Sequence, residues 1–319
     1  MKAKKLLLTA LPLMVAAISL MTSCSANDDD ILSKNTDDGY TVFSAVAPGS
    51  PETRTLIGKY KEGKGFPFYW ADKDVIYVKD DNNVWQKSQP LNIPEYIWGK
   101  PTANFNVPGK FSPDKAYEVR YFGSESYGQD YNQGVSGYVY YQYGVNYSNA
   151  TKSKGTCGVG YASYKNGHYT FKLNHKFAYL CLLPYTNGQD KSWNYTLDFV
   201  NVHAKNSRLN GTYNLINGKL VLQQTGHAED IRVFTRYPGQ SHFANNFGIN
   251  VTTTEPNPDE VAVFVPIFPG KHELEIKFFQ TLVESTSTNE TNFKLPEKDY
   301  EPGKVYTVKC LLKSVGLVN

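Results

Sequence analysis

Apolar residues recur at every second position in short runs along this chain, and this two-residue period restricts its fold more than any other feature. Side chains of a β-strand point alternately to the two faces of a sheet, so such runs predict strands. Thr102–Val107 is one example, and Gly, Pro, Asn or Asp separates each run from the next. No long stretch has the 3.6-residue period of an amphipathic helix. The pattern therefore predicts an all-β fold.

The predicted strands follow one another without intervening helices, an order typical of β-sandwiches. Asn217-Gly218 lies between two of the runs and is a favoured pair for a type I′ hairpin turn. A glycine-, tyrosine- and asparagine-rich stretch, which we expect to pack poorly, gives way near 165–176 to a strongly apolar run. The predicted strands are 40–47, 74–78, 102–107, 117–122, 169–173, 177–185, 195–203, 213–222 (a hairpin), 261–267, 274–283 and 305–312.

The N-terminus has the layout of a secretory signal peptide. Three lysines precede an apolar stretch, 6–20, that is shorter than the roughly 20 residues of a membrane-spanning helix. Small residues then lead into Cys24, which resembles the lipobox of bacterial lipoproteins, with Met21 where Leu, Val or Ile is usual. We expect 1–23 to be a lipoprotein signal peptide and lipidated Cys24 to anchor the chain in outer-membrane lipid. A plain signal peptide followed by an unmodified cysteine is the alternative.

The segment 24–39 is polar and is predicted to be a flexible acidic tether. Its Asp28-Asp29-Asp30 run resembles the export signal that sends some lipoproteins to the outer face of the outer membrane, so we expect a cell-surface location. A purely solvated tether is the alternative. Removal of the signal peptide lowers the 33 basic residues to 30, equal to the 30 acidic ones. A neutral chain has no basic field to attract nucleic acid.

Cysteine usage and motif content exclude several kinds of chemistry. Beyond Cys24 the chain has Cys157 in a predicted glycine-rich loop, and Cys181 and Cys310 in apolar runs that predict burial. None of the three has metal-ligand spacing, and the sequence does not exclude one disulfide between two of them. The chain contains no Gly-x-Ser-x-Gly, Walker loop or His-Glu-x-x-His, and its six histidines are scattered. We expect the protein to have no enzymatic activity and to bind no cofactor or metal. Two carboxylates distant in sequence could still form a glycosidase pair.

Tyrosines crowd the region 117–147 among Gly, Gln, Asn and Ser. This is the composition of adaptable binding loops, and exposed tyrosine rings can stack on sugars. The candidate ligand surface consists of Tyr138, Tyr140, Tyr141 and Tyr143, with a surface ligand or glycan as the partner. A long irregular excursion with one amphipathic strand is the alternative.

Seven segments, in this order, resemble the fimbrillin-like family of anaerobe surface lipoproteins, which are subunits and accessory proteins of type V pili. Each segment alone is a weak signal. The resemblance is specific because the segments occur in the family's order over nearly the whole mature chain. Lys73 stands where the family usually has Gly, so we expect that turn to differ. The segments are Tyr40–Ala45, Thr53-Arg54-Thr55, Trp70-x-x-x-Asp74-x-Ile76-x-Val78, Ala103-Asn104-Phe105, Tyr117–Tyr121, Leu173–Ala178 and Pro302–Val308.

The resemblance implies two tandem transthyretin-like β-sandwich domains, at 40–170 and 171–319, and assembly with other pilus subunits. In the family a protease cuts after an N-terminal arginine, the first strand leaves, and a strand of the next subunit takes its place. The matching residue here is Arg54, and the strand to be removed contains Tyr40, Val42, Phe43, Ala45 and Val46. An ordinary loop arginine after a permanent strand is the alternative.

Only seven residues, 313–319, follow the last predicted strand, which favours a tip, anchor or accessory subunit over a repeating stalk subunit. The sequence leaves a second function open, which is a surface glycan-binding lipoprotein associated with an outer-membrane transporter. Such a protein would share the anchor, the location and the β-sandwiches.

Overall fold

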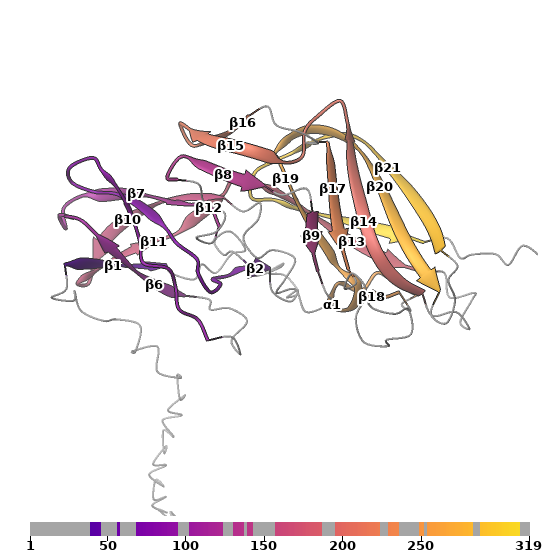
Figure 1. Cartoon of the computed structure of the whole chain (residues 1–319), viewed down its shortest axis with the longest axis horizontal. Coiled ribbons are helices and arrows are strands. Elements are labelled where there is room, and N and C mark those ends of the chain that lie inside the picture. The colour runs from indigo at the N-terminus through magenta and orange to yellow at the C-terminus, as the bar shows by residue number, and fades with distance from the viewer. Residues whose placement is uncertain are drawn as a thin grey trace, which may run out of the picture. The chain divides into compact units, whose positions relative to one another are not determined.

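The computed structural model describes residues 39–45, 56–57, 68–94, 102–123, 130–136, 139–142, 157–186, 195–223, 229–235, 249–251, 254–282 and 288–312. Within these ranges the chain forms 22 strands and one four-residue helix (Figure 1). The prediction of an all-β fold is confirmed.

Most strands from residues before 176 join one eight-stranded sheet. Its order is β5-β4-β7-β10-β11-β1-β6, with β12 paired to β10. A separate pair, β2 (Leu56–Ile57) and β3 (Phe68–Tyr69), is antiparallel. The strands of the large sheet are β1 (Tyr40–Ala45), β4 (Tyr77–Lys79), β5 (Trp85–Lys87), β6 (Ala103–Pro108), β7 (Ala116–Tyr121), β10 (Gly158–Lys165), β11 (His168–Phe171) and β12 (Leu173–His175).

Residues after 176 build three more sheets, two of which take in a strand from earlier in the chain. A three-stranded sheet has the order β19-β13-β22, a six-stranded sheet β21-β20-β14-β17-β9 with β18 beside β14, and a third sheet β16-β15-β8. Their strands are β8 (Gln133–Ser136), β9 (Val139–Tyr141), β13 (Ala178–Tyr185), β14 (Tyr195–Lys205), β15 (Gly211–Ile216), β16 (Lys219–Leu222), β17 (Asp230–Phe234), β18 (Ile249–Asn250), β19 (Val263–Ile267), β20 (Gly270–Leu282), β21 (Thr288–Tyr300) and β22 (Val305–Leu311).

Strand β13 separates two hydrophobic cores. Successive side chains point to opposite faces of a strand. Leu180 and Leu182 therefore pack into one core with side chains of β14, β19 and β20, whereas Cys181 and Leu183 pack into another. The second core also contains Phe122, which directly follows β7 of the large sheet. Burial on both faces explains why this run is continuously apolar instead of alternating.

The third core lies against the large sheet. Trp70 is its largest side chain and meets the rings of Phe105 and Tyr121 edge-on, at centroid distances of 4.9 and 5.4 Å. The Tyr121 hydroxyl donates to Asp74 Oδ1 at 2.8 Å, which satisfies a fully buried carboxylate. Because this core closes around aromatic side chains from several strands, it depends on the whole sheet.

Turn signals in the sequence were reliable. Asn217 and Gly218 have φ angles of 49° and 71° between β15 and β16, which confirms the predicted type I′ turn.

Lys73 has a φ of 64°, so its turn keeps the left-handed backbone that glycine favours, although we expected this turn to differ. Lys73 N–H donates to Leu91 carbonyl oxygen at 3.0 Å and helps to fix this conformation.

Several strand bounds differ from the prediction, and two of them have a clear local cause. Asn257 caps the short helix α1 (Pro258–Val261), its Oδ1 accepting from Asp259 N–H at 3.0 Å, so the strand expected over 261–267 begins only at Val263. The strand expected over 74–78 begins at Tyr77, because Asp74 Oδ2 accepts from Ala71 N–H at 2.7 Å and closes a turn there.

Polar composition hid strand β21, which the sequence did not predict. It pairs with β20 from end to end, and from Thr288 to Leu295 its residues alternate between exposed and partly or fully buried. Exposed charges such as Lys294, Glu297 and Lys298 lie along this edge of the sheet. Such charges oppose pairing with another chain, which explains why an edge strand can be this polar.

The glycine-rich stretch was expected to pack poorly, but its last part, 157–165, packs closely, whereas 143–156 lies outside the described residues. A Cβ atom on Gly160 of β10 would lie 2.1 Å from the carbonyl oxygen of Lys172, so only glycine allows the chain to pass there. Cys157, which was predicted to lie in a loop, immediately precedes β10 and is fully buried. Small residues here reflect a close approach of two backbones.

The segment 130–142 connects the large sheet to the later sheets. Strand β8 pairs with β15, and β9 pairs in parallel with β17. Gln142, fully buried, donates from Nε2 to the Ala262 carbonyl oxygen at 2.5 Å and accepts from Phe264 N–H at 3.1 Å. Residues on both sides of position 170 thus share sheets, and the division into domains 40–170 and 171–319 stays a prediction.

Replacing Gln142 tests the importance of this connection. Gln142→Ala leaves the buried carbonyl of Ala262 and the N–H of Phe264 without this partner, and we expect the free energy of unfolding to fall by about 3 kcal/mol. Chemical denaturation measures it. The control is Gln89→Ala, an exposed glutamine whose amide donates to Tyr40 Oη, with an expected loss below about 0.5 kcal/mol. Equal losses in both variants would contradict this role.

Candidate functional site

Strand β1 is the candidate site, because it lies inside the large sheet although it is the first described strand of the chain. It pairs antiparallel with β6 from Tyr40–Pro108 to Ala45–Ala103. On its other side it pairs in parallel with β11, from Phe43–Tyr169 to Ala45–Phe171. Both backbone edges of β1 are therefore used. Withdrawing it would expose unpaired edges on β6 and β11 together.

The side chains of β1 are buried on both faces from Val42 onward. Phe43 is fully buried, stacks on the Tyr169 ring at 4.8 Å and meets the Phe111 ring edge-on at 4.9 Å. On the opposite face Ser44 donates from Oγ to Asn104 Oδ1 at 2.8 Å. The site thus requires a large ring at one position and a small polar side chain at the next.

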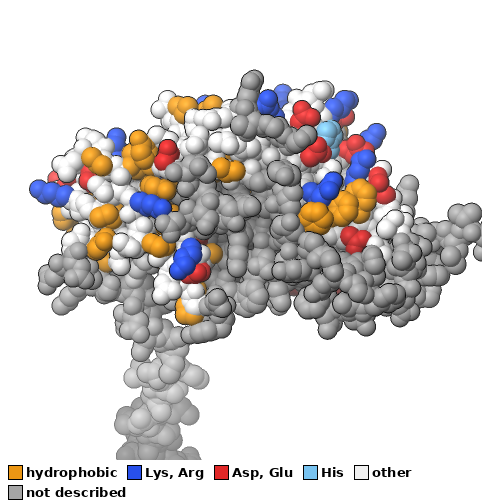
Figure 2. Space-filling model, in the orientation of Figure 1, with side chains coloured by type: hydrophobic (Ala, Val, Ile, Leu, Met, Phe, Trp, Pro, Cys, Tyr) orange, Lys and Arg blue, Asp and Glu red, His pale blue; other side chains and the backbone are white. Residues whose placement is uncertain are grey.

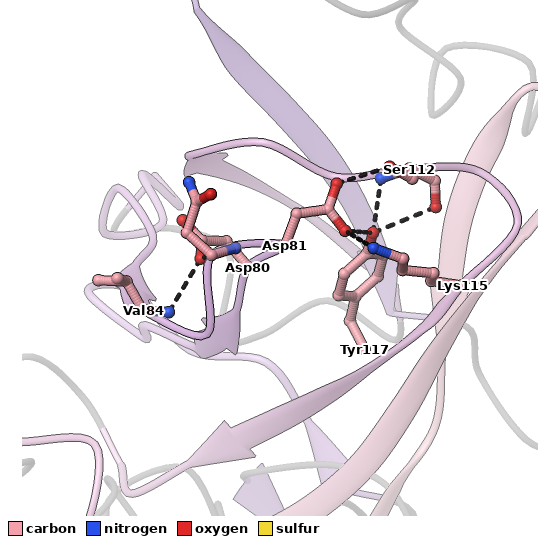
Figure 3. A network of polar contacts seen from close by, with 7 residues as sticks. Asp80, Asp81, Val84, Ser112, Lys115 and Tyr117 are labelled. Atoms are coloured by element: carbon pink, nitrogen blue, oxygen red, sulfur yellow. Dashed lines mark hydrogen bonds and ion pairs between the residues drawn. The ribbon is translucent and has the colours of Figure 1, made fainter.

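A polar network holds one wall of this site (Figure 3). Asp81 accepts from Ser112 Oγ at 2.6 Å, Lys115 Nζ at 2.8 Å and the Tyr117 hydroxyl at 2.8 Å. Tyr117 in turn meets the ring of Phe111 edge-on at 5.0 Å, and Phe111 contacts Phe43. The network therefore fixes the segment that packs against the buried ring of β1.

The adjacent Asp80 shapes the turn that carries Asp81. Its Oδ1 accepts from the N–H groups of Asn82 and Val84, both at 2.9 Å, and its Oδ2 accepts from Gln86 Nε2 at 2.8 Å. Aspartate side chains commonly fold back on the following backbone in this way. These hydrogen bonds close the turn between β4 and β5.

The Asp81 network is also an electrostatic feature. The hydrogen bonds from Lys115, Ser112 and Tyr117 lower the pKa of Asp81 well below its usual range. The same hydrogen bond to Asp81 raises the pKa of Lys115. These shifts mean that the charged forms of both groups are favoured in the folded state.

Several predicted site residues lie outside the part of the chain that the structure describes. These are Cys24, Arg54, Val46, Tyr138 and Tyr143.

Tyr140 and Tyr141, by contrast, belong to β9, and their backbones pair with Val233 and Phe234. The alternative for this region, a long irregular excursion with one amphipathic strand, also allows a strand here. A ligand role for the four tyrosines stays a prediction.

The three described cysteines are buried and form no disulfide with one another. Burial raises the pKa of Cys157 and of Cys310 to about 12, and it raises the pKa of Cys181 as well. Thiols with raised pKa values carry little thiolate at neutral pH and are poor nucleophiles or metal ligands. Within the described ranges, no cluster of three His, Cys, Asp or Glu side chains could hold a metal ion.

A second feature, which the sequence did not reveal, is a polar pocket of about 550 Å³. Residues on either side of the β8–β15 pairing line it, and no sequence signal connects them except the predicted hairpin tip at Asn217. The lining residues are Arg120, Asp130, Asn132, Gln133, Asn214, Leu215, Ile216, Asn217 and Gln223.

No helix in the described ranges is both long enough and apolar enough to span a membrane.

No protein-family model matches the chain, and no curated protein sequence matches it. Among solved structures it is similar to a candidate cell adhesion protein from Bacteroides ovatus, at 13% identity and a TM-score of 0.45, covering 85% of this chain and 92% of that one. A candidate cell adhesion protein from Bacteroides uniformis has 12% identity and a TM-score of 0.44, with coverages of 86% and 94%. A fimbrial anchor protein from Porphyromonas gingivalis has 12% identity and a TM-score of 0.29, with coverages of 76% and 82%.

Acid titration tests the Asp81 network. A lowered pKa contributes stability above the unfolded value, near 3.8, and this contribution is lost as pH falls through the folded pKa. We therefore expect Asp81→Asn to be less stable than wild type at pH 7, with the difference shrinking below about pH 4. Thermal unfolding between pH 2 and 8 measures it.

The control is Glu297→Gln, which neutralises an exposed carboxylate on β21. Its stability should follow that of wild type at every pH. A difference between Asp81→Asn and wild type that is independent of pH would contradict the electrostatic explanation.

Proposed function

We propose that this protein is a pilus subunit on the outer surface of the outer membrane, joined to neighbouring subunits by strand exchange and contributing to adhesion. The observation that carries the proposal is the place of β1, an interior strand at the start of the described chain. Only ten residues, 46–55, connect it to β2, and they include Arg54. A single cut there would separate β1 from the rest of the chain.

Removal of β1 would leave a groove that water does not fill favourably. The groove would expose the apolar residues Phe105, Phe111 and Tyr169, and full burial of one large apolar side chain is worth about 1.5–3 kcal/mol. An extended segment from another subunit could restore both this burial and the two ladders of backbone hydrogen bonds. Strand exchange therefore follows from the same forces that hold β1 in place.

The groove also specifies the incoming strand. It must run parallel to β11 and antiparallel to β6, as β1 does. It must carry a large apolar side chain where Phe43 lies and a small one at Ser44. These requirements give assembly a direction and a sequence preference.

Cleavage and anchoring exclude each other in one molecule. The proposed lipid is on Cys24, which precedes both β1 and Arg54 in the chain. A cut after Arg54 would therefore remove the anchor together with the strand. An intact chain would stay on the membrane with its own β1 in place, whereas a cut chain would be able to join a fibre.

Limited proteolysis tests the cleavage step. An arginine-specific protease should cut after Arg54 and give a folded product that begins at Thr55, because Pro48-Gly49-Ser50-Pro51 disfavours regular structure before the site. Mass spectrometry identifies the new N-terminus. Arg54→Lys should resist this protease. Cleavage at other arginines while Arg54 stays intact would contradict the proposal.

Peptide binding tests the groove. After cleavage and removal of the N-terminal fragment, a labelled peptide of residues 40–47 should bind the product saturably. The peptide with Phe43→Ala should bind at least about 100-fold more weakly, since deleting a buried Phe ring costs roughly 3–5 kcal/mol. Thr41→Ala, at a half-buried position, should change the affinity by less than about threefold. Equal binding of all three peptides in fluorescence anisotropy would exclude a specific groove.

A further inference from the structure

The polar pocket beside the β8–β15 pairing combines features that suit one class of ligand. Five of its nine lining residues carry side-chain amides. An amide has two donor hydrogens and an acceptor oxygen, which suits neighbouring sugar hydroxyls. Gln133 Nε2 donates to Gln223 Oε1 at 3.3 Å, and this bond leaves the second Nε2 hydrogen of Gln133 and the Nε2 group of Gln223 for a ligand. Its volume of about 550 Å³ lies within the usual range for small-ligand sites. The amide residues are Asn132, Gln133, Asn214, Asn217 and Gln223.

The pocket walls are fixed before any ligand binds. Asp130 Oδ1 accepts from the N–H groups of Asn132 and Gln133 at 2.6 and 2.8 Å, which holds the turn before β8. Leu215 N–H donates to the Asn132 carbonyl oxygen at 2.8 Å and joins this turn to the opposite wall. A preformed site loses less entropy when it binds a ligand.

The charge of Arg120 is matched within the protein. Its Nε donates to Glu118 Oε1 at 2.8 Å, and its Nη1 donates to Asn132 Oδ1 at 2.6 Å and to the Tyr131 carbonyl oxygen at 3.1 Å. The guanidinium is therefore engaged in orienting the pocket. An anionic ligand would have to compete with Glu118, so the site favours a neutral one.

An exposed aromatic ring lies next to these residues in the chain. Tyr131, between the lining residues Asp130 and Asn132, is 39% exposed. Its ring stacks on Trp85 at 5.5 Å and 12°, and the Arg120 guanidinium lies 4.3 Å from the Trp85 ring centre. The stack orients the tyrosine ring, and part of the residue remains exposed to solvent.

A row of partly exposed phenylalanine rings on the six-stranded sheet is less suited to bind a ligand than the polar pocket. Phe234, Phe199 and Phe279 lie opposite one another on β17, β14 and β20, and Figure 2 shows hydrophobic side chains beside basic ones over these strands. Phe199 and Phe279 stack face to face at 4.1 Å, and the Arg232 guanidinium lies 4.9 Å from the Phe199 ring centre. Their faces are already occupied by one another, so the row stabilises the sheet.

We propose that the pocket lined by Asn132, Gln133, Asn214, Asn217 and Gln223 binds a short neutral glycan, with Tyr131 stacking on a sugar ring at its rim. This goes beyond the assembly function and does not depend on it, because none of these residues belongs to β1 or its groove. Hydroxyl groups would bond to the amides, and the apolar face of one sugar would cover the tyrosine.

Calorimetric titration of the intact monomer tests the proposal. The probes are neutral tri- to hexasaccharides built from glucose, mannose, galactose, fucose and N-acetylhexosamine units, and sialylated and sulfated analogues. We expect at least one neutral probe to bind one site per chain. Gln223→Ala and Asn214→Ala should each weaken binding roughly 2- to 10-fold, and Tyr131→Ala about tenfold.

Matched controls separate the pocket from the rest of the surface. Asn174→Ala removes an exposed amide on β12, and Tyr161→Ala removes a 66% exposed tyrosine on β10; both should bind like wild type. The proposal is wrong if no neutral probe binds, if only acidic probes bind, or if the pocket variants bind as tightly as the controls. Circular dichroism of each variant confirms that weaker binding does not reflect unfolding.

Discussion

Burial of both faces of a strand is the constraint on which this structure depends. Strand β13 contributes alternate side chains to two cores, so neither core closes without it. Strand β1 of the large sheet is constrained in the same way, because it has partner strands on both edges and buried side chains on both faces. A strand of this kind can leave only if another strand replaces it. The difference between the two is that β13 lies mid-chain, whereas β1 is the first described strand.

The segment 130–142 makes the separate sheets into one framework. It supplies a strand to each of two later sheets and ends in Gln142, whose amide is satisfied by backbone groups more than 100 residues away. The same segment forms one wall of the polar pocket. The connection between the sheets and the proposed ligand pocket therefore share backbone hydrogen bonds. A pocket built on paired strands keeps its amides in place, which suits recognition of a hydroxyl-rich ligand.

The proposed assembly groove and the proposed ligand pocket consist of different residues. The groove of β1 is bounded by β6, β11 and the aromatic side chains held by the Asp81 network, while the pocket is formed by the start of β8 and the β15–β16 hairpin. Each can thus be altered without removing a residue of the other. Under both proposals, such a separation would allow the ligand pocket to vary while the means of joining subunits stays the same.

The sequence by itself determined the strands that alternate cleanly and the turns whose residues demand a left-handed backbone. The β15–β16 hairpin and β1 were predicted because local sterics and a two-residue period decide them. It did not reveal β21, whose polar residues become a strand only through pairing with β20, or the place of Gly160, which depends on a neighbouring carbonyl. The β1 strand was a candidate from its motif, but only the fold showed that it is interior. The pocket and the role of Gln142 needed tertiary structure altogether, because hydrogen bonds between residues 120–142 and 214–264 leave no periodic trace in a sequence.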